Sequence, residues 1–191
     1  MKVLIETSAR HIHLSRKDLD ILFGKNYKLS LKKELSQPGQ FLSNEKVNLK
    51  INGKSICGIS ILGPERKDTQ VEISLTDSRK LKIDVPIRES GKTEDSPGGT
   101  LIGPHGELEI SRGIIVAKRH IHMSPDDAYI GGFIDGEECN LEIITEHRSL
   151  ILSQTIIRID KKFKLRAHID TDEANAAGIS LPIYGSITRM F

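Results

Sequence analysis

Two His-x-His pairs are the residues of this sequence with the clearest capacity for chemistry. The first is His11 with His13, and the second is His120 with His122. Because side chains alternate between the two faces of a β-strand, both imidazoles of a pair on a strand point to the same side. Two such nitrogens can bind one zinc ion at about 2.0–2.1 Å. A single pair is explained equally well by a polar strand face, but two pairs in matching contexts indicate metal binding.

Each pair needs a third ligand, and Glu72 and His168 are the candidates. Both lie in segments that alternate apolar and polar residues, 71–75 and 166–170. The alternatives are a solvated strand carboxylate for Glu72 and a hydrogen-bonded surface imidazole for His168. Three protein ligands leave one coordination position open, which is typical of a catalytic metal rather than a structural one.

Other polar groups give weaker signals. Cys57 and Cys139 stand alone in the sequence, so we expect both to be small buried residues rather than zinc ligands. Arg66 lies in a turn-rich segment, 63–70, and its guanidinium could bind a phosphate through two hydrogen bonds. A solvated arginine in a surface turn is the alternative interpretation.

An internal repeat indicates which elements position the histidines. Residues 8–15 read SARHIHLS and residues 117–124 read AKRHIHMS. A β-like run precedes each copy, and a serine that can cap a helix ends it, so each His-x-His is predicted where a strand leads into a short helix. Gly24 and Gly131 are predicted to end these helices. A weaker similarity, of residues 80–83 (KLKI) to residues 162–165 (KFKL), aligns Glu72 with Gln154 and His168 with Pro86. The repeat alone would divide the chain near residue 112.

Most other segments read as short strands. Alternation predicts strands over residues 71–75, 81–85 and 108–110, with a further strand over 156–159, while residues 88–106 read as a long mobile loop. Aromatic residues make up only 4% of the chain, so the core must be aliphatic. The predicted fold class is mainly β (α+β), with two small β-barrels related by internal duplication, each capped by short helices.

Composition excludes several classes of protein. The 28 basic and 26 acidic residues leave a net charge of +2 without a basic cluster, and aromatic platforms are scarce, so nucleic-acid binding is not expected. No apolar run approaches the length of a membrane span, and no signal peptide is recognisable. Two isolated cysteines give no disulfide framework. We therefore expect a cytoplasmic protein with no membrane partner.

Several motifs together resemble one known family. They are SARHIHLS, LSQPGQF at 35–41, ILGPERKDTQVEIS at 61–74, GPHGELEISRGIIVAKRHIHMS at 103–124 and HIDTDEANAA at 168–177. In this order, and over nearly the whole chain, they are similar to the phosphate propanoyltransferases, also called propanediol-utilisation-type phosphotransacylases. The resemblance implies an acyltransferase that interconverts a short-chain acyl-CoA (propanoyl- or acetyl-CoA) plus phosphate with acyl-phosphate plus CoA.

The resemblance also implies an architecture and a set of site residues. The family has two divalent metal ions, usually zinc, between two capped β-barrels, and forms homodimers or larger homo-oligomers. The implied barrels here are residues 10–117, and residues 1–9 with 118–191. Position by position, the implied ligands are His11, His13 and Glu72 for one metal and His120, His122 and His168 for the other; Arg66 is the phosphate-binding residue, and Ser8, Ala9, Arg10, Lys33, Leu62 and Asn175 are CoA contacts.

Two features depart from the family pattern. Ser60 stands where the family is expected to have an arginine, which puts the affinity for CoA in question. The amphipathic N-terminal extension of microcompartment members is not seen before the first predicted strand, so that targeting route is not expected.

For the reaction we expect direct, metal-assisted attack of phosphate on the thioester, without an acyl-enzyme. One alternative is a binuclear metal hydrolase of thioesters or phosphate esters. The other is a non-catalytic CoA-binding module whose metals are structural.

Overall fold

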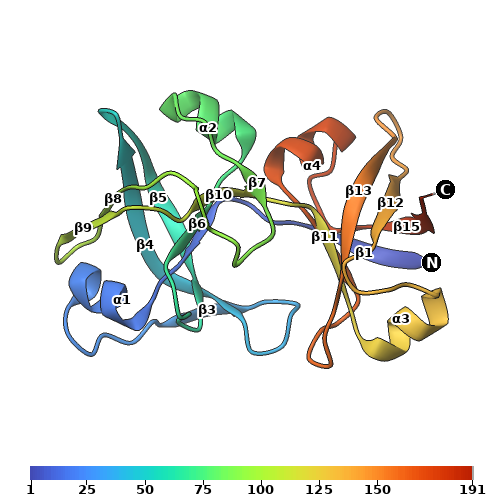
Figure 1. Cartoon of the computed structure of the whole chain (residues 1–191), viewed down its shortest axis with the longest axis horizontal. Coiled ribbons are helices and arrows are strands. Elements are labelled where there is room, and N and C mark those ends of the chain that lie inside the picture. Colours follow the sequence, from blue (N-terminus) through green and yellow to red (C-terminus); the bar gives the residue numbers. More distant parts are fainter. Residues whose placement is uncertain (191) are drawn as a thin grey trace. The chain divides into compact units, whose positions relative to one another are not determined.

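The computed structural model describes residues 1–190, and these residues divide into two compact units (Figure 1). Unit 1 consists of Met1–Ala9, Ser36–Pro38 and the described residues from Lys118 onward, and unit 2 consists of Arg10–Leu35 and Gly39–Ala117. No helix within the described part of the chain is long and apolar enough to cross a membrane.

Unit 1 is built on a closed barrel of short strands. Around the barrel the order is β1-β14-β11-β13-β12-β15. Its core consists of buried aliphatic side chains, among them Val3, Ile121 and Ile157, because the strands place alternate residues on the inner face. The strands are β1 (Lys2–Thr7), β11 (His120–Met123), β12 (Glu138–Ile143), β13 (Leu150–Ile159), β14 (Arg166–Ile169) and β15 (Ile183–Arg189).

Unit 2 is a nine-stranded sheet with its own aliphatic core. Its order is β7-β10-β6-β2-β5-β4-β8-β9, with β3 paired to β4. The longest strands, β4 and β5, form an antiparallel pair. The strands are β2 (His11–His13), β3 (Leu31–Glu34), β4 (Phe41–Ile51), β5 (Lys54–Gly63), β6 (Gln70–Glu72), β7 (Ile87–Arg88), β8 (Gly99–Ile102), β9 (Glu107–Ile110) and β10 (Ile114–Ala117).

Within residues 1–190, four short helices accompany the strands: α1 (Arg16–Phe23) and α2 (Leu75–Leu81) in unit 2, and α3 (Pro125–Gly131) and α4 (Thr171–Ala177) in unit 1. Each begins after a residue whose side chain accepts a hydrogen bond from a backbone N–H in the first turn; these residues are Ser15, Ser74, Ser124 and Asp170. In Figure 1, α3 lies below the strands of unit 1, and α4 lies beside the upper part of β13. The predicted fold class, two small barrel-like β-units with short helices, is confirmed.

The two units repeat one arrangement of strands. In unit 2, β2 lies between β6, which is antiparallel to it, and β5, which is parallel. In unit 1, β11 lies in the same way between β14 and β13. The next strand out is parallel in both units, β10 beside β6 and β1 beside β14. Thus β1 precedes β2 along the chain but belongs to unit 1, and β10 precedes β11 but belongs to unit 2.

Three local predictions are wrong. The strand over residues 81–85 is not formed: the Ser74 cap starts α2, which runs to Leu81 and ends at Lys82 in the left-handed conformation. Residues 88–106 are not one loop, because β8 lies within them and pairs with β4 and β9. Helix α3 ends at the C-cap Gly132, one residue beyond the predicted glycine, whereas Gly24 ends α1 as predicted.

Candidate metal centres

The first cluster of potential metal ligands joins β2 to β6 in unit 2. His11 is the register partner of Glu72, and His13 lies on the same face of β2 as His11. The Nε2 atom of His11 is 3.2 Å from Nε2 of His13 and 3.3 Å from Oε2 of Glu72. All three side chains are buried, and their ligand atoms lie within 4.8 Å of one another. The structure thus brings these three predicted ligands together in a group that could hold one ion.

Electrostatics prepare this first cluster for a cation. Burial lowers the pKa of His13 well below its ordinary value, and the neighbouring His11 lowers it further. Burial alone would raise the pKa of Glu72, but His11 and His13 outweigh that effect and hold the pKa of Glu72 well below its usual range. Metal binding requires ligands without protons, and these shifts favour the proton-free forms of His13 and Glu72.

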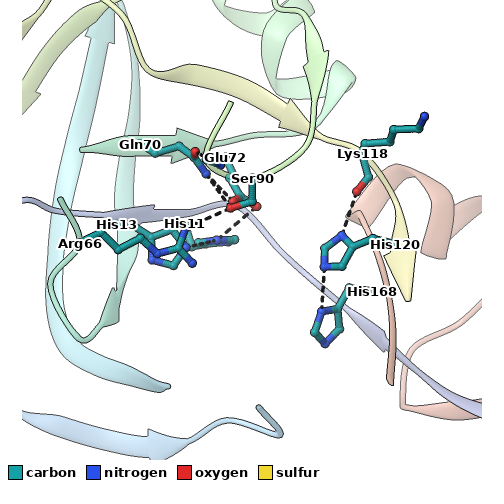
Figure 2. A network of polar contacts seen from close by, with 10 residues as sticks. His11, His13, Arg66, Gln70, Glu72, Ser90, Lys118, His120 and His168 are labelled. Atoms are coloured by element: carbon teal, nitrogen blue, oxygen red, sulfur yellow. Dashed lines mark hydrogen bonds and ion pairs between the residues drawn. The ribbon is translucent and has the colours of Figure 1, made fainter. Parts of the chain in front are cut away.

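A hydrogen-bonded network connects this cluster to Arg66 (Figure 2). The Nε2 group of Gln70 donates to Oε1 of Glu72 at 2.6 Å and to Oγ of Ser90 at 3.0 Å. Arg66 donates from Nη1 to the same Ser90 oxygen at 3.0 Å. The predicted phosphate-binding residue and the predicted ligand Glu72 are therefore linked through two polar side chains.

Sequence reasoning missed both of these linking residues. Gln70 lies two residues before Glu72 on β6, so strand alternation, which places them on one face, was a signal that could have identified it. Ser90 follows β7 in a segment interpreted as a loop, and no local pattern marks it.

The second cluster joins β11 to β14 in unit 1. His120 is the register partner of His168, and its Nε2 lies 3.3 Å from Nδ1 of His168 (Figure 2). The ring of His122 is centred 4.6 Å from that of His120 and 5.0 Å from that of His168. The ligand atoms of the three residues also lie within 4.8 Å of one another. Three imidazoles at this spacing are a donor set suited to zinc.

The two clusters occupy corresponding places in the repeated arrangement. Glu72 lies opposite the first histidine of β2, and His168 lies opposite the first histidine of β11. The alignment of Glu72 with Gln154 and of His168 with Pro86 is therefore wrong. It relied on resemblance between residues 80–83 and 162–165, which are the end of a helix in one unit and a turn in the other.

Glu6 is a further group beside the second cluster that the sequence did not reveal. Its Oε2 lies 3.2 Å from Nε2 of His168. The hydrogen bond with His168 lowers the pKa of Glu6 and outweighs the opposing effect of burial, so Glu6 is a carboxylate at neutral pH.

The predicted CoA contacts fall into two groups, one in each unit. In unit 2, Lys33 and Leu62 both pair with Leu42 of β4, so they flank it on one face of the sheet. Arg10 forms an ion pair with Asp77 at 2.9 Å. Ser60, the departure from the family pattern, is the register partner of His11.

In unit 1, the backbone N–H of Ser8 donates to the carbonyl of Ile169, and Ala9 is the next residue. Asn175 is exposed on α4, the helix that follows β14. CoA binding by these residues of the two units stays a prediction.

The cysteines differ from each other. Cys139 is buried as expected, and burial raises the pKa of its thiol to about 12. The expectation for Cys57 is wrong, because this residue is exposed: it lies on the outward side of β5, where the buried positions are taken by isoleucines.

Comparison with known proteins identifies relatives over nearly the whole chain. Residues 4–180 match the family model described as phosphate propanoyltransferase. A phosphate propanoyltransferase of Enterococcus faecalis is 44% identical over 97% of this chain and 87% of its own length, and that of Thermotoga maritima is 46% identical over 92% and 83%. That of Citrobacter freundii is also 46% identical over 92% of this chain and 83% of its own. This chain therefore belongs to the phosphate propanoyltransferase family.

Proposed function

We propose that this protein is a phosphotransacylase that interconverts a short-chain acyl-CoA and phosphate with acyl-phosphate and CoA. Its relatives carry that activity in their names. The observation that carries the proposal is the network of unit 2, in which Arg66, Ser90 and Gln70 connect to the cluster of His11, His13 and Glu72. An anion-binding guanidinium beside a metal-binding cluster is suited to a phosphate substrate.

Both clusters fit divalent metals, and zinc is the ion that we propose. Ligation by His11, His13 and Glu72 in one cluster, and by His120, His122 and His168 in the other, would leave a coordination position open in each. A metal with an open position supplies Lewis acidity toward a thioester carbonyl or a phosphate oxygen.

The chain's own groups would orient the reactants. Arg66 is half-buried and hydrogen-bonded to Ser90, so its guanidinium is held in place to bind phosphate oxygens. One phosphate oxygen then attacks the thioester carbonyl carbon, the carbon–sulfur bond breaks, and the proton of the phosphate passes to the CoA thiolate. Holding two reactants in this way can lower the barrier by several kcal/mol.

Direct transfer fits the state of the buried cysteine. Cys139 donates its thiol hydrogen to the backbone carbonyl of Thr155 at 3.2 Å, and its pKa of about 12 keeps it protonated. A protonated, buried thiol is a poor nucleophile, so we expect no acyl-enzyme at this residue.

The test is a thioester-cleavage assay on zinc-loaded protein with acetyl-CoA and propanoyl-CoA, each with and without phosphate. Loss of thioester absorbance is a better signal than a thiol reagent, because exposed Cys57 would react with the reagent. We expect phosphate-dependent cleavage and a product that hydroxylamine traps as a hydroxamate. Cleavage that yields free acid regardless of phosphate would instead identify a hydrolase.

Two variants complete the test. Arg66→Ala should raise the KM for phosphate far more than the KM for the acyl-CoA, because in this proposal the guanidinium binds phosphate and not the acyl-CoA. His11→Ala combined with His13→Ala should give a folded, inactive protein that binds one metal fewer. A folded, metal-loaded wild-type protein that cleaves neither thioester would leave the non-catalytic CoA-binding module as the better explanation.

A further inference from the structure

Glu6 and His168 are neighbours by strand register in unit 1. In the parallel pairing of β1 with β14, Glu6 is the register partner of His168. Their side chains meet, with Oε2 of Glu6 at 3.2 Å from Nε2 of His168. The other ring nitrogen of His168, Nδ1, lies 3.3 Å from Nε2 of His120. The imidazole of His168 thus has one nitrogen directed to a carboxylate and the other to the second cluster.

The hydrogen-bond partners determine which nitrogens carry hydrogen. Nδ1 of His120 lies 2.9 Å from the backbone carbonyl of Lys118, which can only accept, so this nitrogen carries the hydrogen and Nε2 has the lone pair. The carboxylate of Glu6 is also only an acceptor, so the hydrogen of neutral His168 lies on Nε2. The lone pairs of His120 Nε2 and His168 Nδ1 then face each other, an arrangement that a shared cation stabilises.

The internal duplication shows that a carboxylate at the position of Glu6 is not a general requirement of the fold. The corresponding residue of unit 2 is Ile115, which is the register partner of Glu72 as Glu6 is of His168. In unit 2 the third ligand, Glu72, is a carboxylate and its register partner is the apolar Ile115. In unit 1 the third ligand, His168, is an imidazole and its register partner is the carboxylate Glu6. Each cluster therefore has one carboxylate, either as a ligand or directly behind a ligand.

Glu6 is itself held by a segment distant in the sequence. Ser36 donates from Oγ to Oε2 of Glu6 at 2.5 Å. The adjacent Gln37 is buried, and its side-chain amide forms two hydrogen bonds with the backbone of Lys164, at 3.0 and 3.1 Å. Ser36–Pro38 belongs to unit 1, although the residues on both sides of it belong to unit 2.

We propose that Glu6 is the positioning residue of the second metal centre: it fixes the tautomer and the orientation of His168 so that Nδ1 faces the metal. This inference rests on the proposed metal centres. Carboxylate partners of metal-bound histidines typically change metal affinity by 10–100-fold when they are removed.

The experiment measures zinc affinity of each centre in the folded protein by competition with a chromophoric chelator. We expect Glu6→Gln to weaken binding of one equivalent by roughly 10–100-fold and to leave the other equivalent unchanged. The matched control is Glu142→Gln, because Glu142 also lies on a strand of unit 1 and accepts a hydrogen bond from a serine, Ser186, at 2.8 Å. This control should bind both equivalents as the wild type does.

A second readout reports the geometry of the centre. With cobalt in place of zinc, Glu6→Gln should shift the visible absorption of one centre. In the metal-free Glu6→Gln variant, nitrogen NMR of His168 should show that the imidazole no longer exists as the single Nε2–H tautomer. Glu6→Gln is used in place of Glu6→Ala because glutamine keeps the shape of the side chain, so the variant should fold and its metal affinity can be measured.

The outcomes separate this inference from the proposed function. Wild-type protein that binds fewer than two metals would overturn the proposed metal centres themselves. Wild-type protein that binds two, together with a Glu6→Gln variant of unchanged affinity and spectrum, would refute the positioning role alone. Complete loss of one equivalent in Glu6→Gln would also refute it, because Glu6 would then be a ligand.

Discussion

Replacing Gln70 with alanine should weaken metal binding at the first centre without altering any ligand. The side-chain amide of Gln70 is buried and makes three contacts: it donates to Glu72 and to Ser90, and it accepts from the backbone N–H of Gly91 at 2.7 Å. In Gln70→Ala, Oε1 of Glu72 loses its hydrogen bond from Gln70, so the carboxylate is held less firmly beside the two histidines.

The magnitude follows from these contacts. A hydrogen bond to a charged group contributes about 1.5–3 kcal/mol and a neutral one about 0.5–1.5 kcal/mol. Loss of the bonds to Glu72, Ser90 and Gly91 should therefore lower the unfolding free energy of the metal-free protein by roughly 2.5–6 kcal/mol. Zinc affinity of the first centre should fall about 10–100-fold, as is usual for a lost partner of a metal ligand.

Two measurements test this reasoning: denaturant unfolding of the metal-free protein, and chelator competition for each zinc equivalent. The control is Ser78→Ala, because Ser78 is also buried in unit 2 and donates from Oγ to the carbonyl of Ile83 at 2.7 Å, away from the ligands. It should lose about 1 kcal/mol of stability and keep wild-type zinc affinity. Equal zinc affinity in Gln70→Ala and the wild type would refute the idea that Gln70 holds Glu72 in place.

Three further predictions concern other parts of the chain. A thiol reagent should modify Cys57 rapidly in the folded protein and Cys139 only after unfolding, because Cys139 is buried and its pKa is raised to about 12; rapid reaction of both thiols would contradict this. Burial tends to raise the pKa of Glu45, but its hydrogen bonds to Ser30 prevail and lower it from 4.5. The stability that Glu45 contributes is therefore complete above the unfolded-state pKa and is lost as pH falls through the lowered folded-state pKa. Because Glu45 is partly exposed, Glu45→Gln should reduce the loss of unfolding free energy on acidification by only a few tenths of a kcal/mol; identical pH profiles would be the contrary result. Gly98→Ala should lower the free energy of unfolding by about 3 kcal/mol or more, because the added Cβ would lie 2.0 Å from the backbone oxygen of Ile110. Thermal unfolding measures this change, and unchanged stability would mean that the backbone can move there.

The His-x-His pairs could be interpreted from the sequence because both the spacing and the duplication are local patterns. Strand alternation is sufficient to place His11 and His13 on one face, and the serine after each pair is sufficient to predict the following helix. The third ligands were harder: Glu72 and His168 are brought to the histidines by antiparallel pairing, which depends on register between distant segments. Residue patterns marked Glu72 and His168 as candidates but left a solvated carboxylate and a surface imidazole equally possible, and the family resemblance then assigned each residue to its pair.

What the sequence did not reveal depends on tertiary structure. Alternation over residues 81–85 indicated a strand, but the capped helix α2 extends to Leu81, and Ile83 and Val85 pack on the core of unit 2 without joining a strand. Glu6 and Ile115 differ in chemistry at corresponding positions, and that difference acquires meaning only when their register partners are known.

The place of β1 has a consequence for how the chain folds during synthesis. Of the strands described, β1 is made first, yet it pairs with β14 and β15, the last two to be made. Nearly all of unit 2 can emerge from the ribosome and form its core while β1 still lacks both neighbours. The barrel of unit 1 closes only after β15 has emerged, and a ribosome that stalls before β15 leaves β1 with an open edge prone to aggregation.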